Sequence, residues 1–541
     1  MIRTKVLNVL LFLISIIFFS YIFYIQFFRH RYYEDRARQQ HEKKYVLFGS
    51  RGNIYDRNGL PIATSEQCFS IFCTPRYAVD EARLARELAL VSGGSADGFR
   101  KLIRSREFFC VEMKVDQGQR DHYLGINDPS IGFTYDLNRR YNMPEIFTSL
   151  IGRCGSENRG IEGLELQFDD ILSGDSGFTV YQKDPMGSVF PYHNHAEKEP
   201  EPGSNVYLTI DLQLQAILYD KLNDCLEKEK ARYAAGIIVE PKSGDILAMV
   251  NVGSERDLRN HIICDEFEPG STFKLMPLTF AIQNGALETD IIDTEAGKIK
   301  VHGHLINDYR NYGVVTLRQA IAHSSNVAMV KLSRKFDRES FLLMVRDFGF
   351  GELTGIEFPG ETRGRVPDAR EVNDVEFATL VFGQGLTVNL LQLGMAYQAI
   401  ANDGVLCKPT ILQEIRDGGR TVHEVHPLRI RRIVDASTAR RVTEILCSVI
   451  EEGSGTAAAF NGVKIAGKTG TAQKVIDGKY SNRSIITTFV GYFPADDPEY
   501  LIMLLIDEPK SGYWASTIVA PVFREVAQSV HQMSSHHYAA K

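Results

Sequence analysis

The sequence predicts an α+β protein with folded domains behind one membrane-spanning helix, and three observations carry this prediction. An uncharged apolar segment occupies residues 6–28. A patterned region of short strands and amphipathic helices follows, up to a polar, proline-punctuated stretch at residues 193–204. Beyond that stretch, apolar strands are separated by amphipathic helices, which is typical of a sheet flanked by helices.

The segment from Val6 to Phe28 is expected to cross a membrane. It carries no charge, and at about 1.5 Å per residue a helix of this length crosses a hydrocarbon layer of roughly 30 Å. No small-residue cleavage site follows it, which favours an uncleaved anchor over a secretory signal or a buried core helix. Basic residues flank both ends, and because long domains translocate regardless of flanking charge, their count leaves the orientation open.

The composition excludes two classes of site. A net charge of -7 argues against nucleic-acid binding, since phosphate contacts need a basic surface. The eight cysteines are scattered without a Cys-x-x-Cys pair, so we expect no zinc site and no other metal or cofactor. Cys68 and Cys73 lie in a strand-like run and are expected as small core residues, with a disulfide as the alternative.

The region after the anchor predicts a small accessory α/β domain. A basic, helical neck is expected at residues 32–44, and Asp56–Gly59 carries the Asn-Gly signal of a hairpin turn. Residues 80–110 have the spacing of amphipathic helices, and residues 160–174 are helix-like with glycine at both ends.

The C-terminal region predicts a sheet with helices on it, starting near Asn205. The expected helices are at residues 211–230, 271–284 and 520–532. The expected strands are at residues 206–210, 235–239, 246–250, 463–472, 485–493 and 500–507.

Ser271 and Lys274 form the first chemical motif. They follow the Pro269-Gly270 turn, and if Ser271 opens a helix, the i, i+3 spacing places hydroxyl and amine on one face. A lysine can take the proton of a serine nucleophile where desolvation or nearby cations favour the neutral amine. The pattern alone is weak, because such a pair arises by chance roughly once or twice in a chain of this length.

Two later motifs supply partners for this pair. Ser324-Ser325-Asn326 is expected on a loop between two helices, the first opened by a capping box at Thr316; Ser324 there suits a proton relay and Asn326 a substrate amide. The alternative is a pair of helix-capping residues. In the strand at residues 463–472, Lys468 and Thr469 offer a cation and a hydroxyl to a carboxylate, Gly470 lets a ligand backbone approach, and the Thr471 N–H offers an oxyanion donor.

The ordered set Ser-x-x-Lys, Ser-x-Asn and Lys-Thr-Gly resembles the penicillin-binding protein and serine β-lactamase superfamily. Residues 51–59 and 160–174 resemble the N-terminal pedestal motifs of class B penicillin-binding proteins. The resemblance implies an antiparallel sheet flanked by helices, an all-helical subdomain and a pedestal. The expected boundaries are 1–28 for the cytoplasmic tip and anchor, 29–200 for the pedestal and 201–541 for the transpeptidase domain.

The resemblance also implies the function. It points to a peptidoglycan D,D-transpeptidase on the extracytoplasmic side of the plasma membrane, acting on D-Ala-D-Ala stem peptides and inhibited by β-lactams. The catalytic residues would be Ser271, Lys274 and Ser324, and the substrate-binding residues Asn326, Lys468, Thr469, Gly470 and Thr471. The chain length resembles the septal type, with a membrane glycosyltransferase and division proteins as expected partners. The alternatives are an elongation-type transpeptidase, a serine β-lactamase and a non-catalytic division scaffold. One departure is Tyr513-Trp514-Ala515-Ser516, where the family has a Gly-Gly pair after the aromatic.

Overall fold

The computed structural model describes residues 2–47, 49–106, 108–155, 158–183, 189–191, 198–253, 259–476 and 478–539. Residues 193–197 of the predicted polar linker lie outside these ranges. The chain divides into two compact units, one made of Met1–Arg51 and Ser173–Gly203 and the other of Gly52–Leu172 and Ser204–Lys541. Each unit is described by itself.

The first unit begins with one long apolar helix. Helix α1 (Ile2–Phe23) continues into a π-helical turn, η1 (Tyr24–Phe28), and together they are long and apolar enough to cross a membrane, with a mean hydropathy of 2.6 over their most apolar 18 residues. Helix α2 (His30–His41) follows, so the predicted helical neck ends earlier than expected. Strand β1 (Glu42–Leu47) then pairs with β6 (Gly177–Lys183), which pairs with β7 (Val189–Pro191).

The second unit contains a mixed seven-stranded sheet with the strand order β17-β16-β8-β2-β3-β4, in which β5 also pairs with β3. The bounds are β2 (Ile54–Tyr55), β3 (Pro61–Cys73), β4 (Phe109–Val115), β5 (Ile131–Tyr141), β8 (Asn205–Leu208), β16 (Leu412–Asp417) and β17 (Arg420–Glu424). The predicted hairpin joins β2 to β3, and Gly59 supplies the positive φ of +80° that its turn needs. Cys68 and Cys73 are free and buried in β3, which confirms their core placement.

Strand β8 differs from the expectation in its partners. It was expected to open the C-terminal sheet, but it pairs in parallel with β2 and antiparallel with β16. A strand of four residues can satisfy its backbone groups in either sheet, so sequence alone does not select its neighbours.

Short helices cover the accessory part of this sheet. Their bounds are η2 (Pro75–Tyr77), α3 (Glu81–Ser92), α4 (Ala96–Ser105), α5 (Gln117–Gly125), α6 (Pro144–Ile151), α7 (Gly163–Gln167) and α8 (Asp169–Leu172). Leu84, Leu88 and Ile103 bury against Phe69 and Ile71 of β3, so the predicted amphipathic helices of residues 80–110 are confirmed. At the other end, the Arg139 Nε donates to buried Glu165 at 2.7 Å.

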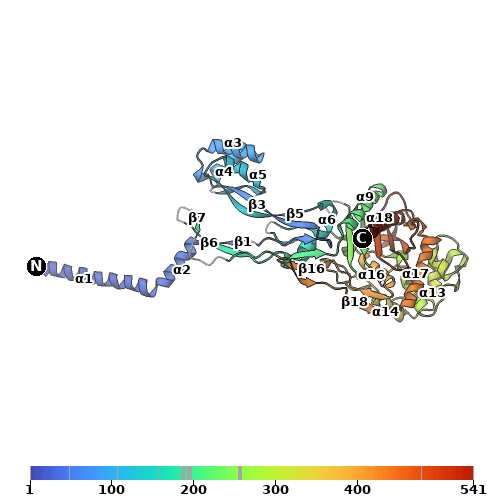
Figure 1. Ribbon diagram of the computed structural model, residues 1–541. Helices are drawn as coiled ribbons and strands as arrows, with labels where there is room; N and C mark the ends of the chain where they lie inside the picture. The colour runs from blue at the N-terminus through green and yellow to red at the C-terminus, as the bar shows by residue number, and fades with distance from the viewer. Residues whose placement is uncertain are drawn as a thin grey trace. The chain divides into compact units, whose positions relative to one another are not determined.

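A five-stranded antiparallel sheet forms the centre of the second unit, with the order β10-β9-β21-β20-β19. Its strands are β9 (Tyr233–Val239), β10 (Ile246–Val252), β19 (Ala466–Ile476), β20 (Lys479–Phe493) and β21 (Tyr500–Asp507). Helices α9 (Leu212–Glu229) and α18 (Val519–Ala539) lie side by side against it (Figure 1). The predicted antiparallel sheet flanked by helices is therefore confirmed.

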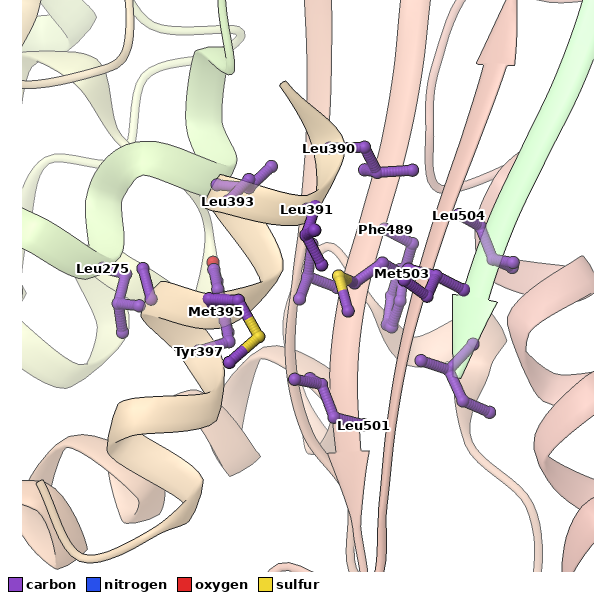
Figure 2. Packing of buried hydrophobic residues seen from close by; sticks show 14 of the residues in the cluster. Leu275, Leu390, Leu391, Leu393, Met395, Tyr397, Phe489, Leu501, Met503 and Leu504 are labelled. Carbon is purple, nitrogen blue, oxygen red and sulfur yellow. The ribbon is translucent and has the colours of Figure 1, made fainter. Parts of the chain in front are cut away.

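Successive side chains of β21 point to opposite faces of the sheet, and both faces are buried. Leu504 faces α9, because a Cβ placed on Gly236 would meet both Leu504 and Leu218. Its neighbour Met503 faces α16 (Leu390–Ala401) on the opposite side, and Figure 2 shows α16 packed between this strand and Leu275. The approach is so close that a Cβ on Gly394 would lie 1.5 Å from the Met503 sulfur.

The remaining elements build the helical subdomain and its surroundings. The helices are α10 (His261–Cys264), η3 (Gly270–Lys274), α11 (Leu275–Gln283), η4 (Glu295–Gly297), α12 (Leu317–Ala322), α13 (Asn326–Ser333), α14 (Arg338–Asp347), α15 (Asp374–Leu380), α17 (Ala436–Glu451) and η5 (Thr456–Ala458). Three small ribbons accompany them: β11 (Ile291–Asp293) with β14 (Val314–Thr316), β12 (Lys298–Val301) with β13 (His304–Asn307), and β15 (Val405–Cys407) with β18 (Arg429–Arg432).

Candidate active site

Ser271 and Lys274 lie on the 3₁₀ turn η3, not on the first turn of an α-helix. The α-helix α11 begins only at Leu275, so the predicted helix start at Ser271 is wrong by four residues. In a 3₁₀ turn the side chains at i and i+3 eclipse, which brings the serine and the lysine onto one face more closely than α-helical spacing does.

Neighbouring backbone holds this turn in place. Gly270 has a φ of +54° and its N–H donates to Gly383 O at 3.0 Å. A Cβ on Gly383 would lie 2.1 Å from Gly270 O, so no other residue fits there. From α16, the Tyr397 hydroxyl donates to Thr272 O at 2.7 Å. The turn is thus fixed from two sides, and its residues are buried except for Ser271, which faces a cleft.

The amine of Lys274 is buried among oxygen atoms. Its Nζ lies 2.5 Å from Ser324 O, 2.7 Å from Asn326 Oδ1 and 3.1 Å from Ser324 Oγ. Asn326 Nδ2 donates to Asn307 O at 3.2 Å, which orients the amide oxygen of Asn326 toward the lysine.

This geometry suits a neutral amine. The carbonyl of Ser324 and the amide oxygen of Asn326 can only accept, so they take the two hydrogens of an uncharged Lys274. The lone pair is then left for a hydroxyl proton. Burial, and after it the neighbouring Lys468 cation, hold the pKa of Lys274 well below its usual 10.5, while Asp308 acts in the opposite direction.

The Ser324-Ser325-Asn326 loop divides its roles between adjacent serines. Ser325 caps α13, accepting from Ala328 N at 3.0 Å, and its hydroxyl donates to Asp308 at 2.6 Å. Ser324 has a φ of +61° and directs its side chain to the lysines instead. The cap of α13 is therefore Ser325, and neither Ser324 nor Asn326 caps it as the alternative expected, while the capping box predicted at Thr316 is present.

Strand β19 supplies the opposite wall. Lys468 is fully buried, and its Nζ donates to Ser324 Oγ at 3.1 Å and to Thr469 O at 3.2 Å. Burial lowers the pKa of Lys468 to about 7. Thr469 and Thr471, two apart and so on one face of the strand, both line the cleft. Gly470 between them is required by crowding, since a Cβ there would lie 2.5 Å from Thr488 Oγ1 and 2.9 Å from Thr272 Cγ2.

Ser271, Ser324, Asn326, Thr469 and Thr471 meet at one cleft of about 660 Å³, and the amines of Lys274 and Lys468 are connected to it through Ser324 Oγ. It is lined by Ser271, Asn307, Asp308, Tyr309, Arg310, Tyr312, His323, Ser324, Asn326, Glu452, Gly453, Ser454, Thr469, Thr471, Trp514, Ala515, Ser516 and Thr517. The unusual Tyr513–Ser516 segment contributes to it directly. Ala515 N donates to Thr471 Oγ1 at 3.0 Å, and the Trp514 ring meets Tyr309 edge to face at 4.7 Å.

Three supporting residues were not predicted from the sequence. Asp308 accepts from the backbone N–H groups of Asn326 and Val327 at 2.5 and 3.0 Å and so fixes the loop. The hydroxyl oxygens of Ser454 and Thr469 lie 2.9 Å apart, within hydrogen-bond distance. Glu268 accepts from Gly385 N at 2.8 Å beside the turn. None belongs to a spaced motif, so only the fold reveals them.

Comparison with known proteins gives matches over nearly the whole chain. The family model described as penicillin binding protein transpeptidase domain matches residues 234–528, and the penicillin-binding protein dimerisation domain matches residues 47–208. Peptidoglycan D,D-transpeptidase FtsI of Escherichia coli is 31% identical over 89% of this chain and 83% of its own length. Stage V sporulation protein D of Bacillus subtilis is 29% identical over 96% of this chain and 84% of its own length.

Solved structures agree with the sequence relatives. Penicillin binding protein 3 of Mycobacterium tuberculosis, complexed with aztreonam, has a TM-score of 0.72 at 26% identity, covering 91% of this chain and 97% of that one. A peptidoglycan synthetase of Bifidobacterium adolescentis has a TM-score of 0.73 at 26% identity with the same coverage.

Proposed function

The chain belongs to the penicillin-binding protein transpeptidase family, and on this premise we propose that it cross-links peptidoglycan stem peptides through an acyl-enzyme on Ser271. It is a class B, septal-type D,D-transpeptidase, with a dimerisation domain ahead of the catalytic domain. The observation that supports the proposed residues best is the convergence of the Lys274 and Lys468 amines on Ser324 in the cleft that also exposes Ser271.

Acylation begins with Ser271. Lys274, neutral because it is buried, takes the proton of the Ser271 hydroxyl as Oγ attacks the carbonyl between the two terminal D-alanines. A new Oγ–C bond forms, and the backbone N–H groups of Ser271 and Thr471 stabilise the oxyanion. Lys468 and Thr469 hold the terminal carboxylate, while the narrow space at Gly470 keeps the strand close to the turn.

Collapse of the tetrahedral intermediate breaks the C–N bond. Ser324, within 3.1 Å of the Lys274 amine, passes the proton from Lys274 to the departing D-alanine nitrogen. Asn326 orients Lys274 and lines the cleft beside the substrate amide. An amine of a neighbouring strand then attacks the acyl-enzyme ester, forming the cross-link and returning the proton to Ser271.

We propose that β-lactams inhibit this enzyme. One structural relative, penicillin binding protein 3 of Mycobacterium tuberculosis, was solved in complex with aztreonam and in complex with ampicillin. In this chain the strained lactam carbonyl takes the place of the donor peptide and acylates Ser271, with the drug carboxylate at Lys468 and Thr469.

The anchor places this activity at a membrane. The N-terminal helix fits a single membrane span. We assign residues 1–28 to the cytoplasmic tip and anchor, 29–200 to the pedestal and 201–541 to the catalytic domain, on the extracytoplasmic side where peptidoglycan lies. A membrane glycosyltransferase and division proteins are the proposed partners.

The test is labelling by fluorescent penicillin. Wild-type protein takes the label, and Ser271→Ala does not, whereas Ser340→Ala on α14, away from the cleft, labels like the wild type. Labelling that persists in Ser271→Ala would show that Ser271 is not the nucleophile. The rate of hydrolysis of a chromogenic cephalosporin tests the β-lactamase alternative, since a β-lactamase hydrolyses it rapidly and a transpeptidase hydrolyses it slowly. Growth supported by Ser271→Ala in cells lacking the wild type would favour the scaffold alternative.

A further inference from the structure

A second cavity, of about 430 Å³, lies in the helical subdomain. Its walls come from the β12–β13 hairpin, the end of α13 and the segments of α14 and α15. Among the described residues, it shares no lining residue with the catalytic cleft. Its volume falls in the range of about 300–1,000 Å³ that is typical of ligand sites. The lining residues are Lys300, Val301, His302, Val330, Ser333, Arg334, Phe336, Arg338, Asp374, Phe377 and Ala378.

One wall of this cavity is fixed by an ionic cluster. The Asp374 carboxylate accepts from Arg338, and its second oxygen lies 2.5 Å from His302 Nε2 at the tip of the hairpin. Arg338 also donates to Val372 O at 3.2 Å, and its guanidinium carbon lies 5.1 Å from the centre of the Phe377 ring. The hydrogen bond from Arg338 lowers the pKa of Asp374 below its usual 3.8. The charges of this wall therefore compensate one another.

Two further cations of the cavity have no counter-ion. Lys300 on β12 and Arg334, directly after α13, are both exposed. In the described part of the chain, neither side chain forms an ion pair or a hydrogen bond. A phosphate monoester carries a charge of about −1.5 to −2 at pH 7 and three accepting oxygens. It matches two cations on facing walls better than a carboxylate, which carries a single charge.

The same cavity also offers apolar contact. Val330, Phe336, Phe377 and Ala378 all line it, and Phe336 is only half-buried. Ligand sites typically combine such apolar walls with a few polar groups that fix the orientation of the ligand. The chemistry of the cavity therefore fits a phosphate group that is attached to a small apolar body.

Two walls of the cavity are the outer ends of elements that reach the catalytic residues. Helix α13 runs from Asn326, whose Oδ1 lies 2.7 Å from Lys274 Nζ, to the residue before Arg334. In the hairpin, β12 carries Lys300 and β13 ends at Asn307, whose carbonyl oxygen accepts from Asn326 Nδ2 at 3.2 Å. A ligand that binds both cations thus restrains the two elements that meet beside Lys274.

We propose that this cavity binds a small organic phosphate monoester through Lys300 and Arg334, and that the bound ligand is an effector that accelerates acylation of Ser271. The effector role rests on the proposed function, whereas the binding site does not. Restraint of α13 and the hairpin reduces the motion of Asn326 around Lys274, so less order remains to be gained in the reaction. We expect acceleration of about 5-fold, the lower end of typical coupling between two sites.

Calorimetric titration of the full-length protein tests the binding site. Phenyl phosphate should bind more tightly than inorganic phosphate, which lacks the apolar body, and than phenol, which lacks the charge. Butyl phosphate distinguishes an aliphatic, lipid-like body from an aromatic one, according to which ester binds more tightly. Lys300→Gln and Arg334→Gln should each weaken binding by about 10- to 100-fold, because each removes a charge-assisted hydrogen bond.

Lys298→Gln is the matched control for these variants. It removes an exposed lysine from the same strand, but outside the cavity, and should bind phenyl phosphate like the wild type. Thermal unfolding shows whether each variant is folded. Wild-type protein that binds neither ester at millimolar concentrations, or folded Lys300→Gln and Arg334→Gln variants that bind like the wild type, would overturn the site.

The rate of labelling by fluorescent penicillin tests the effector role. Phenyl phosphate should raise this rate in the wild type and in Lys298→Gln, and should leave it unchanged in the double variant Lys300→Gln/Arg334→Gln. An unchanged or slower rate in wild-type protein saturated with phenyl phosphate would overturn the effector role. Failure of the proposed function has a different signature, namely wild-type protein that takes no label on Ser271 with or without the phosphate.

Discussion

The amines of Lys274 and Lys468 both lie 3.1 Å from a single atom, Ser324 Oγ. Positive charges on two buried amines so close would repel each other, and the Lys468 charge is one cause of the lowered pKa of Lys274. In the proposed mechanism this arrangement divides the roles: Lys274 is the neutral base, and Lys468 is the cation that binds the substrate carboxylate. Ser324 connects them as a hydroxyl that can accept from one amine and donate to the other.

The acylation rate should fall on the alkaline side of about pH 7. Lys468 must be cationic to hold a carboxylate, and because its pKa is lowered to about 7, it loses the proton as the pH rises through that value. The measurement is kcat/KM for acylation by a carboxylate-bearing β-lactam between pH 5 and 9. Lys468→Arg keeps its charge, so its alkaline limb should move to higher pH. A limb unchanged in Lys468→Arg would assign the titration to another group.

Removing the base should slow acylation without unfolding the protein. Lys274→Met preserves the length and apolar stem of the side chain but cannot take the Ser271 proton, so we expect the acylation rate to fall by about 10²- to 10⁴-fold. Lys331→Met, which removes a lysine paired with Glu295 at 2.7 Å in the helical subdomain, serves as the control. Equal rates in the two variants would exclude Lys274 as the base.

Adjacent serines should show opposite phenotypes. Ser325→Ala loses the cap of α13, and we expect a decrease of about 1 kcal/mol in the free energy of unfolding. Ser324→Ala removes no cap, and we expect it to lose mainly acylation activity. Urea unfolding and stopped-flow acylation measure the two effects. A reversed pattern, with stability lost in Ser324→Ala and activity lost only in Ser325→Ala, would contradict the proton relay.

Packing of α16 on the sheet gives a stability prediction. Because a Cβ at position 394 would lie 1.5 Å from the Met503 sulfur, Gly394→Ala should destabilise the protein by about 1–3 kcal/mol despite the better helix propensity of alanine. In the double variant Gly394→Ala/Met503→Ala, the shorter side chain at position 503 should restore part of the lost stability. The melting temperatures of the single and double variants measure the coupling, and strictly additive losses would show that the two residues do not collide.

Sequence patterns predicted which motifs form the site, but they predicted the local backbone geometry of these motifs less well. The order of Ser271, Ser324, Asn326 and Lys468 was sufficient to place them in one site, because each motif is defined by fixed spacing. The 3₁₀ turn could not be predicted, since it depends on Gly383, which is distant in the sequence. The role of Asp308 could not be predicted either, because its partners in the Ser324–Asn326 loop are distant in the sequence. The strands that pair with β8 are determined by the arrangement of the whole sheet and not by the residues of β8 itself.

The most direct test of the central claim is peptide mapping of the penicillin adduct by mass spectrometry. After brief exposure to penicillin, the intact wild-type protein should gain the mass of one penicilloyl group, stable over the time of a purification, and digestion should place it on Ser271. An adduct on any other residue, or none under conditions where the protein is folded, would contradict the account.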